Sequence, residues 1–471
     1  MTSRFKNRVS AWVSAAALSV AAAFPAGAET LADAMASAYN ESGLLEQNRG
    51  LLRAADEDVA ASMAALRPII NWTGSVSQSF GEQASATTGG VYVSRNSTNA
   101  TLGISADLLL YDFGASNFAT DAAKETVLAT RQSLISVEQQ VLLRAVRAFM
   151  TLRSYSEIVA LRQSNMRLIT QELRAARDRF EVGEVTRTDV SLAEARLAEA
   201  QSQLAAAQGD LAIAQEEYRA AVGHPPGNLV PPSSLPRTAA SVEQAKALAV
   251  RNHPDLKQVQ HQVAAADLAI LRAQAAMKPN ISLNGQLSVS ETFDSVSSSR
   301  GGQIGVTASG PIYQGGRLSA ALRRAQAQRD ATRGGLYVVR DQVQQNAGTA
   351  WAQLLVSQAA LSSSADQIRA ARVAFRGVRE EATLGARTTL DVLDAEQELL
   401  NAQAGQISAA ANEYVAAYSL LASMGLLTAD HLNLNVRQYD PTEYYNLVKD
   451  GPALSSQGEK LNRVLEALGK K

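Results

Sequence analysis

The sequence predicts an α+β membrane protein with an internal tandem duplication, and three observations support this fold class. Residues 180–199 recur at 382–401, with matching residues 202 positions apart. Each copy holds a pair of segments in which apolar and polar residues alternate, as they do in β-strands. Each copy also holds a stretch of 67 residues without proline, much longer than a helix of a globular domain. A repeat of this kind determines the architecture before any single element is assigned.

The duplication has two sets of landmarks. At an offset of 202 residues, Tyr111 and Gly114 fall on Tyr313 and Gly316. Segments 65–77 and 276–288 match at an offset of 211, so repeat one holds about nine extra residues between these landmarks. The first repeat covers 29–227 and the second covers 228–427. Six further identical pairs align at the first offset: Gly183 and Gly385, Thr186 and Thr388, Asp189 and Asp391, Val190 and Val392, Glu194 and Glu396, and Leu197 and Leu399.

The first 28 residues have the three parts of a secretory signal peptide. A basic start at residues 4–8, an apolar stretch at 11–24 and small residues at 26–28 precede Glu29. An ordinary buried helix is the alternative interpretation, but it does not explain this order of parts. We therefore expect export, with cleavage after Ala28.

The charge and the missing cysteines exclude several classes of protein. Without the leader the chain has 41 basic and 45 acidic residues, which gives no electrostatic footprint for nucleic acid. A chain without cysteine has no disulfide framework, no thiolate metal site, no catalytic cysteine and no lipid-anchored mature N-terminus. No stretch beyond the leader reaches the 18 apolar residues of a membrane helix. Such an exported chain is periplasmic, is secreted, or crosses a bilayer as a closed β-barrel.

Each repeat is expected to begin with a helix rich in Ala, Gln, Leu and acidic residues. The two helices cover 31–66 and 241–277. Pro68 and Pro279 follow them, and proline disfavours helix at the residue before it.

A β-hairpin follows in each repeat, over 69–113 and 280–315. Apolar residues occupy alternate positions of each strand, and the connecting segments 79–97 and 290–302 are rich in Ser, Gly and Thr. Strands of about ten residues joined by a long polar loop are typical of a transmembrane hairpin of an outer-membrane barrel. A half-buried hairpin of a soluble protein remains the alternative.

Two further helices complete each repeat. The long helices 115–181 and 317–383 are dense in Ala, Leu, Gln and Arg, and at a rise of 1.5 Å per residue each makes a rod of about 100 Å. The return helices 186–222 and 388–425 begin with Thr-x-x-Asp capping boxes. A proline-rich linker separates the repeats. Residues 428–471 form an unrepeated tail, expected on the outside of the molecule with poorly ordered last residues.

Two hairpins supply four membrane strands per chain, which are too few to close a barrel. Single-chain barrels of this type start at about eight strands, and open edges in lipid would leave backbone groups unpaired. The chain must therefore oligomerise. Three copies give a 12-stranded β-barrel, which their rods would continue as an α-helical barrel. Two copies would leave little lumen, and four copies also satisfy the geometry.

Several motifs support this arrangement: PxIxxxG at the strand starts, Y-[DQ]-x-G at 111–114 and 313–316, and GARTTLDVLDAEQELLNAQ at 385–403. Together they resemble the TolC family, the outer-membrane channel proteins of tripartite efflux pumps and type I secretion systems. The resemblance runs from about residue 29 to 427. It implies a homotrimer with a 12-stranded β-barrel in the outer membrane and an α-helical barrel across the periplasm. The missing cysteine makes the chain more similar to the non-lipidated members.

The resemblance places a closed periplasmic entrance at the rod ends farthest from the strands. Asp391 and Asp394 lie there on one helix face, and three copies would stack two rings of carboxylates that favour cations. Capping with Thr388 is the alternative role for Asp391, and a solvated surface is the alternative for Asp394. The counterpart of Asp394 in repeat one is Leu192, so the repeat itself does not require an acid.

The resemblance also implies links that keep this entrance closed. Arg387 occupies the position that contacts Thr188 and Asp189 of the other helical hairpin in the closed state. Ala382 departs from the family, whose members place there a tyrosine that also bonds the gate. The gate therefore has one link fewer, or a different one.

The turns between the long and return helices are where the family's adaptor tips dock. Ordinary turn chemistry is the alternative, because one glycine suffices to end each long helix. The six turn residues are Val182, Gly183 and Glu184 in repeat one and Leu384, Gly385 and Ala386 in repeat two.

No catalytic residue, metal site or cofactor is expected. The four histidines are scattered, and the chain has no HExxH, GxSxG or phosphate-binding glycine motif. We expect a passive duct in outer-membrane lipid, recruited by a periplasmic adaptor and an inner-membrane transporter of RND, ABC or MFS type. The alternative is a structural or adhesive trimeric coiled-coil surface protein anchored by a β-barrel, and the internal hairpin duplication argues against it. Drugs, bile salts, polysaccharide and protein remain open as substrates.

Overall fold

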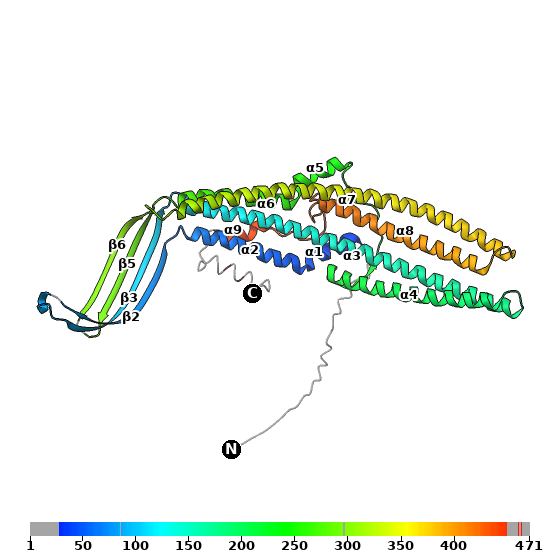
Figure 1. Ribbon diagram of the computed structural model, residues 1–471, viewed down its shortest axis with the longest axis horizontal. Helices are drawn as coiled ribbons and strands as arrows, with labels where there is room; N and C mark the ends of the chain where they lie inside the picture. The colour runs from blue at the N-terminus through cyan, green and yellow to red at the C-terminus, as the bar shows by residue number, and fades with distance from the viewer. Residues whose placement is uncertain (1–27, 85, 295–296, 450–459, 461–462, 464–471) are drawn as a thin grey trace, which may run out of the picture.

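The computed structural model describes residues 28–84, 86–294, 297–449, 460 and 463. The molecule is elongated, with one sheet at one end and helices that run from the sheet to the opposite end (Figure 1). The predicted leader before residue 28 and most of the predicted tail after residue 449 lie outside the described residues.

The sheet contains strands from both repeats. Its order is β2–β3–β5–β6, and every neighbouring pair is antiparallel. The β3–β5 ladder, in which Leu102 lies opposite Val289, joins the first repeat to the second. The two predicted hairpins are therefore one continuous sheet. The strands are β2 (Ile69–Gln83), β3 (Val93–Tyr111), β5 (Asn280–Thr292) and β6 (Ser297–Ser309).

The two faces of this sheet differ in polarity. Paired rows place Trp72, Ile104 and Leu287 on one face, where these side chains are 76%, 53% and 65% exposed. The other face carries polar rows, and Thr101 Oγ1 lies 3.1 Å from Ser290 Oγ there. Within the described chain, the apolar face is therefore open to its surroundings.

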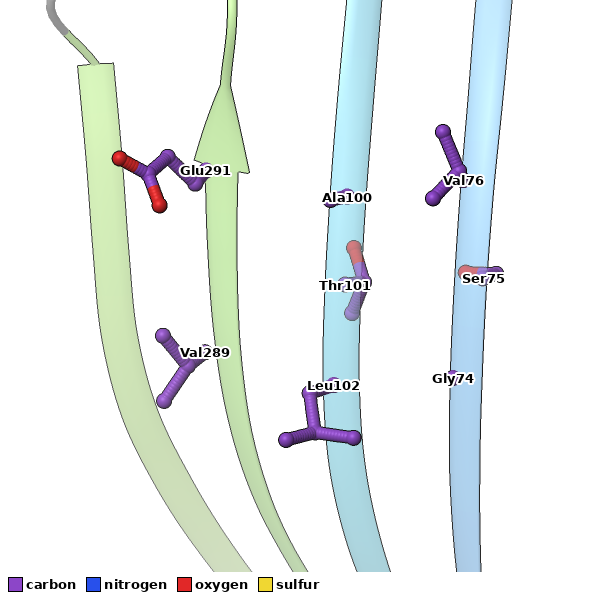
Figure 2. A pocket seen from close by; sticks show the side chains of 8 residues that line it. All are labelled: Gly74, Ser75, Val76, Ala100, Thr101, Leu102, Val289 and Glu291. Carbon is purple, nitrogen blue, oxygen red and sulfur yellow. The ribbon is translucent and has the colours of Figure 1, made fainter.

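A shallow hollow of about 330 Å³ lies on the apolar face (Figure 2). Small residues leave space between Val76, Leu102 and Val289, which come from three different strands. Glu291 is the charged side chain that lines it. The hollow is a gap in an apolar surface, without the several convergent polar groups that fix a small ligand.

The strands extend further than the sequence predicts. Segments 79–97 and 290–302 are predicted to be loops, and this prediction is wrong for their ends, because the ladders continue to the pairs Gln83–Val93 and Thr292–Ser297. Backbone groups make the ladder, so rows of Ser, Thr and Asn continue it as readily as apolar rows.

The last strand ends earlier than predicted. The hairpin predicted over 280–315 stops at Ser309. Pro311 has no N–H to donate to a ladder. A Cβ atom on Gly310 would lie 2.8 Å from Pro279, so the chain leaves the sheet here through a close backbone contact.

Two helices of 67 residues run from the sheet toward the far end (Figure 1). Gly114 and Gly316 precede them with φ angles of 88° and 85°, which glycine adopts at no steric cost. The long helices pack against their return helices, so α3–α4 forms hairpin one and α7–α8 forms hairpin two. No helix of the described residues is long and apolar enough to cross a membrane. The helices are α3 (Ala115–Glu181), α4 (Arg187–Val222), α7 (Arg317–Thr383) and α8 (Thr389–Ser423).

The first helix of repeat one is divided, so the single helix predicted over 31–66 is wrong. α1 (Leu31–Glu41) ends before Ser42, and α2 (Gly43–Ala64) begins after it. The Ser42 hydroxyl accepts a hydrogen bond from the N–H of Leu45 at 3.3 Å, which caps the second helix.

The first helix of repeat two is divided in the same way, so the single helix predicted over 241–277 is also wrong. α5 (Val242–Asn252) stops at His253, and α6 (Pro254–Ala275) begins with proline. Proline suits the first position of a helix, where its missing N–H would have no intrahelical partner.

The main hydrophobic core lies where α1, α3, α4 and α8 meet. Phe149, Tyr218 and Leu420 are fully buried in it. Toward the far end the hairpins pack through narrow seams, centred on Ala193 in hairpin one and Ala402 in hairpin two. Small side chains let neighbouring helices approach closely over this length.

Glu29 fastens the start of the described chain to the linker between the repeats. β1 (Ala28–Glu29) pairs in parallel with β4 (Asn228–Leu229). The Glu29 carboxylate accepts hydrogen bonds from the Tyr218 hydroxyl and from the N–H of Gly227 at 3.1 Å. Burial, reinforced by this carboxylate, raises the pKa of Tyr218.

The tail packs against repeat one. Helix α9 (Pro441–Val448) contacts α2, and Tyr444 donates a hydrogen bond to Glu57 at 2.7 Å. Asp56 in α2 is fully buried. Desolvation raises its pKa to about 6, although the positive charge of Arg131 acts to lower it.

Candidate functional site

Both helical hairpins end far from the sheet in the same type of turn (Figure 1). Paired backbone hydrogen bonds close each turn as a Schellman motif, and Gly183 and Gly385 both have φ of 79°. The bonds run from Gly183 to Phe180 at 3.0 Å and from Glu184 to Arg179 at 2.9 Å in hairpin one, and from Gly385 to Ala382 at 3.1 Å and from Ala386 to Glu381 at 2.9 Å in hairpin two.

All six residues of the predicted docking turns lie on the surface. Val182 and Leu384 occupy equivalent positions and are 72% and 85% exposed. Apart from the glycine itself and its chain neighbours, no heavy atom lies within 4 Å of the place where a Cβ on Gly183 or Gly385 would stand. The tips thus present an apolar side chain next to open space.

Reciprocal capping boxes start both return helices. Thr186 Oγ1 accepts from the N–H of Asp189 at 3.3 Å, and Asp189 Oδ2 accepts from the N–H of Thr186 at 2.9 Å. Thr388 and Asp391 repeat these bonds at 3.2 and 2.9 Å. Hydrogen bonds from the capping threonines lower the pKa of both aspartates. At Asp189 the bond from the threonine side chain is the largest cause, and at Asp391 the bond from the threonine backbone is the largest.

Arg387 pairs within its own hairpin. Its Nε donates to Glu381 Oε2 at 2.8 Å, and both side chains are about half exposed. This contact raises the pKa of Arg387. The predicted link to Thr188 and Asp189 is not formed within the described chain, where Asp189 caps α4 instead.

Asp394 is joined to the other hairpin. One of its oxygens pairs with Nη2 of Arg196 on α4, and the aspartate side chain is 56% exposed. Arg196 also contacts Glu199 Oε2 through Nη1 at 2.9 Å. The acid predicted to contribute a ring of carboxylates at the entrance thus has a partner from repeat one.

A buried carboxylate lies two residues beyond Asp394. Glu396 is 6% exposed and accepts a hydrogen bond from Nδ2 of Asn165 on α3 at 2.8 Å. Desolvation raises the pKa of Glu396 to about 7, and the nearby charge of Glu172 acts in the same direction. This is a second polar side-chain contact between α8 and hairpin one.

The sequence offered unequal signals for the two residues that it did not identify. Arg196 aligns with Glu398 of repeat two, so a comparison of charge along the whole return helix would have singled it out. Asn165 aligns with Gln367, which has the same chemistry, and nothing in the repeat marks it. Among the described residues, no group of three or more His, Asp and Glu side chains could hold a metal ion.

The fold is that of an outer-membrane channel subunit. The outer membrane channel CmeC of Campylobacter jejuni has the same fold, with a TM-score of 0.74 over 89% of each chain and 14% identity. The chain belongs to the outer membrane efflux protein family, whose sequence model matches residues 35–224 and 246–426, one segment in each repeat.

Two relatives agree with this assignment. Outer membrane efflux protein BepC of Brucella suis is 37% identical over 424 residues, which are 90% of this chain and 91% of BepC. Outer membrane protein TolC of Escherichia coli is 22% identical over 357 residues, 72% of each chain. The predicted membership of the TolC family is therefore confirmed, and it supports an outer-membrane location and a role that is not enzymatic.

Proposed function

We propose that this protein is the outer-membrane exit duct of a tripartite efflux pump, which conducts substrates passively from the periplasm to the exterior. One observation carries the proposal: a sheet with an apolar and a polar face lies at one end of the chain, and two equivalent helix tips lie at the other. Helices of 67 residues, each about 100 Å long at 1.5 Å per residue, separate them.

Three copies would complete the membrane part. The sheet of one chain has edges at β2 and β6, and such edges are costly in lipid unless they pair. Three sheets joined edge to edge would form a twelve-stranded β-barrel with Trp72 and Leu287 toward lipid and the hydroxyl rows toward the lumen. Cleavage of the leader after Ala28 would make Glu29 the first residue, and its carboxylate is already held by the linker.

The hairpin tips would form the periplasmic gate of this trimer. Asp391 and Asp394 would supply two rings of carboxylates that favour cations. Arg387 would leave Glu381, which it contacts within the single chain, and reach Thr188 and Asp189 of the other helical hairpin in the closed state.

A periplasmic adaptor would dock on the turns 182–184 and 384–386. The exposed Val182 and Leu384 offer it apolar contacts at equivalent heights on the two tips. An inner-membrane transporter of RND, ABC or MFS type would supply the energy, because the duct has no motif for nucleotide binding.

Efflux is favoured over type I secretion by the 37% identity to BepC, which is described as an efflux protein. Deleting the gene and comparing drug sensitivity with the secreted proteins distinguishes the two roles. We expect greater sensitivity to drugs or bile salts and an unchanged set of secreted proteins. Loss of one secreted protein with unchanged sensitivity would instead assign the duct to secretion.

Recording in planar bilayers tests the conduit against an adhesive role. Purified trimers should conduct, and Asp391→Ala combined with Asp394→Ala should weaken block by multivalent cations. A protein that forms no trimer and passes no current, even in this double variant, would instead support a surface-anchoring role. Unchanged block in the double variant would remove the rings from the proposal while leaving the duct.

A further inference from the structure

Arg196 reaches from one helical hairpin to the other. It lies on α4, and its Nη2 pairs with Oδ1 of Asp394 on α8, 198 positions further along the chain. Helices α4 and α8 otherwise touch only briefly, because each packs mainly on its own long helix. Helix α8 packs more extensively on α3, and Arg379 of α7 also approaches Glu172 of α3 at 3.9 Å, so the ion pair adds α4 to an existing contact between the hairpins.

The guanidinium of Arg196 is held in place from its own hairpin. Glu199, one turn along α4, accepts from Arg196 Nη1 at 2.9 Å and from Gln203 at 3.1 Å. Gln203 in turn accepts from Nη1 of Arg162 on α3 at 2.7 Å. A lone exposed ion pair contributes little, because two long side chains must be ordered to form it. Here one partner is ordered in advance, so pairing costs less side-chain entropy.

A second contact lies behind the ion pair. Glu396 follows Asp394 by two residues, is buried, and accepts from Asn165 of α3 at 2.8 Å. Helix α8 therefore contacts both helices of hairpin one at neighbouring positions, α4 through Asp394 and α3 through Glu396. The pair with Arg196 is the more exposed of these two contacts.

The ion pair between Arg196 and Asp394 has no counterpart in the duplication. In the alignment of the two repeats, Arg196 falls on Glu398 and Asp394 falls on Leu192. The repeat-related positions therefore hold neither an arginine nor an aspartate, and they cannot form the same ion pair. The shared turn and capping geometry of the two tips does not require either residue. Among the described residues the pair lies where hairpin two meets hairpin one, and the repeat supplies no second copy of it.

We propose that Arg196 is a latch residue, which holds hairpin two against hairpin one and neutralises the carboxylate of Asp394 while the tips are together. The inference rests on the proposed function, since a latch matters only in a duct that opens. Separation of the tips breaks the ion pair and exposes one Asp394 carboxylate from every copy. Opening and cation preference are therefore coupled through one arginine.

Bilayer conductance of purified full-length protein tests the latch. Arg196→Ala and Asp394→Ala should each raise single-channel conductance severalfold over the wild type. Arg177→Ala is the matched control, because Arg177 pairs with Glu194 at 2.6 Å within hairpin one and joins nothing to hairpin two. The control should conduct like the wild type, and a wild-type conductance in Arg196→Ala would overturn the latch.

Ion selectivity separates neutralisation from a purely structural role. Arg196→Ala should raise the preference for cations and lower the concentration of a trivalent cation that blocks the channel, because it frees the carboxylates. Asp394→Ala should also raise conductance, but it should increase neither the cation preference nor the block by a trivalent cation, because it removes these carboxylates. Identical selectivity in the two variants would overturn neutralisation, even if both conduct more.

A cross-link tests the contact without any current. The chain has no cysteine, so Arg196→Cys with Asp394→Cys supplies the only thiols. Oxidation should form an intrachain disulfide much faster than in Arg177→Cys with Asp394→Cys, and reduction should restore conductance that the disulfide suppresses. Equal rates in the two pairs would overturn the latch whether or not the protein conducts. A fast cross-link in a protein that never conducts would overturn the duct, and the gating role with it.

Discussion

The two hairpin tips share one backbone and differ in side-chain chemistry. Both turns have a glycine at φ of 79°, and both return helices start with a Thr–Asp capping box. Along the same helices, Leu192 and Arg196 of hairpin one stand where hairpin two has Asp394 and Glu398. Residues that a turn or a cap requires are therefore the same in both tips, while surface residues that neither requires have diverged. The asymmetry of the proposed gate lies in side chains alone.

The largest expected difference between the tips concerns the aligned pair Glu194 and Glu396. Glu396→Gln should stabilise the contact between α3 and α8 by roughly 2–3 kcal/mol at pH 8, because the buried carboxylate is removed while an oxygen remains for Asn165. Hydrogen exchange of α8 amides measures this effect. Glu194→Gln, on the exposed side of hairpin one, is the control.

The sign of the pH dependence follows from the raised pKa of Glu396. The folded state binds the proton of Glu396 more tightly than the unfolded state. The contribution of this proton to the stability of the folded state is therefore fully present below pH 4.5 and is lost as the pH rises through about 7. In the wild type, exchange from α8 should therefore accelerate between these values beyond its intrinsic pH dependence. A similar acceleration in Glu396→Gln would show that another group is responsible.

A smaller and equal effect is expected at the two turn glycines. Gly183→Ala and Gly385→Ala should each destabilise their turn by about 1–2 kcal/mol, because residues with a side chain are strained in the left-handed region. Exchange of the N–H groups of Glu184 and Ala386, which close the turns, reports the loss. A turn that tolerates alanine without change would mean that the two backbones are not equivalent.

The smallest expected effect is loss of a cap. Thr186→Ala and Thr388→Ala should each cost about 1 kcal/mol in the first turn of the return helix, through the lost bond to the N–H of the third residue. Faster exchange of the Asp189 and Asp391 N–H groups measures it. The two variants should match in exchange, and only Thr388→Ala should also alter cation block, because it alone loosens Asp391. If Thr186→Ala also altered the block by cations, Asp391 would not be the residue that makes the two tips differ in cation block.

The features that could be predicted from the sequence arise between neighbours in the chain. The bounds of the long helices follow from Gly114 and Gly316 before them, and the capping boxes span only three residues. The faces of the strands follow from alternation, since successive side chains point to opposite sides. Ser42 and Pro254, which mark the breaks in the first helices, are equally local signals. The surrounding Ala-rich sequence is uniform, however, so it predicts one continuous helix in each repeat. The loop and strand ends cannot be predicted from polarity, because polar side chains do not prevent a backbone ladder.

The sequence by itself determined the repeat, the long rods, the two-faced strands, the capped tips and the family. Only the tertiary structure decided which charges meet. Arg387 lies beside Glu381 instead of Thr188 and Asp189, and Arg196 lies beside Asp394. The same holds for burial, since Glu194 and Glu396 are aligned and identical, yet one is exposed and the other enclosed against Asn165. Hydrogen bonds within a turn depend on adjacent residues, whereas ion pairs and desolvation depend on how whole helices pack across some 200 residues of chain.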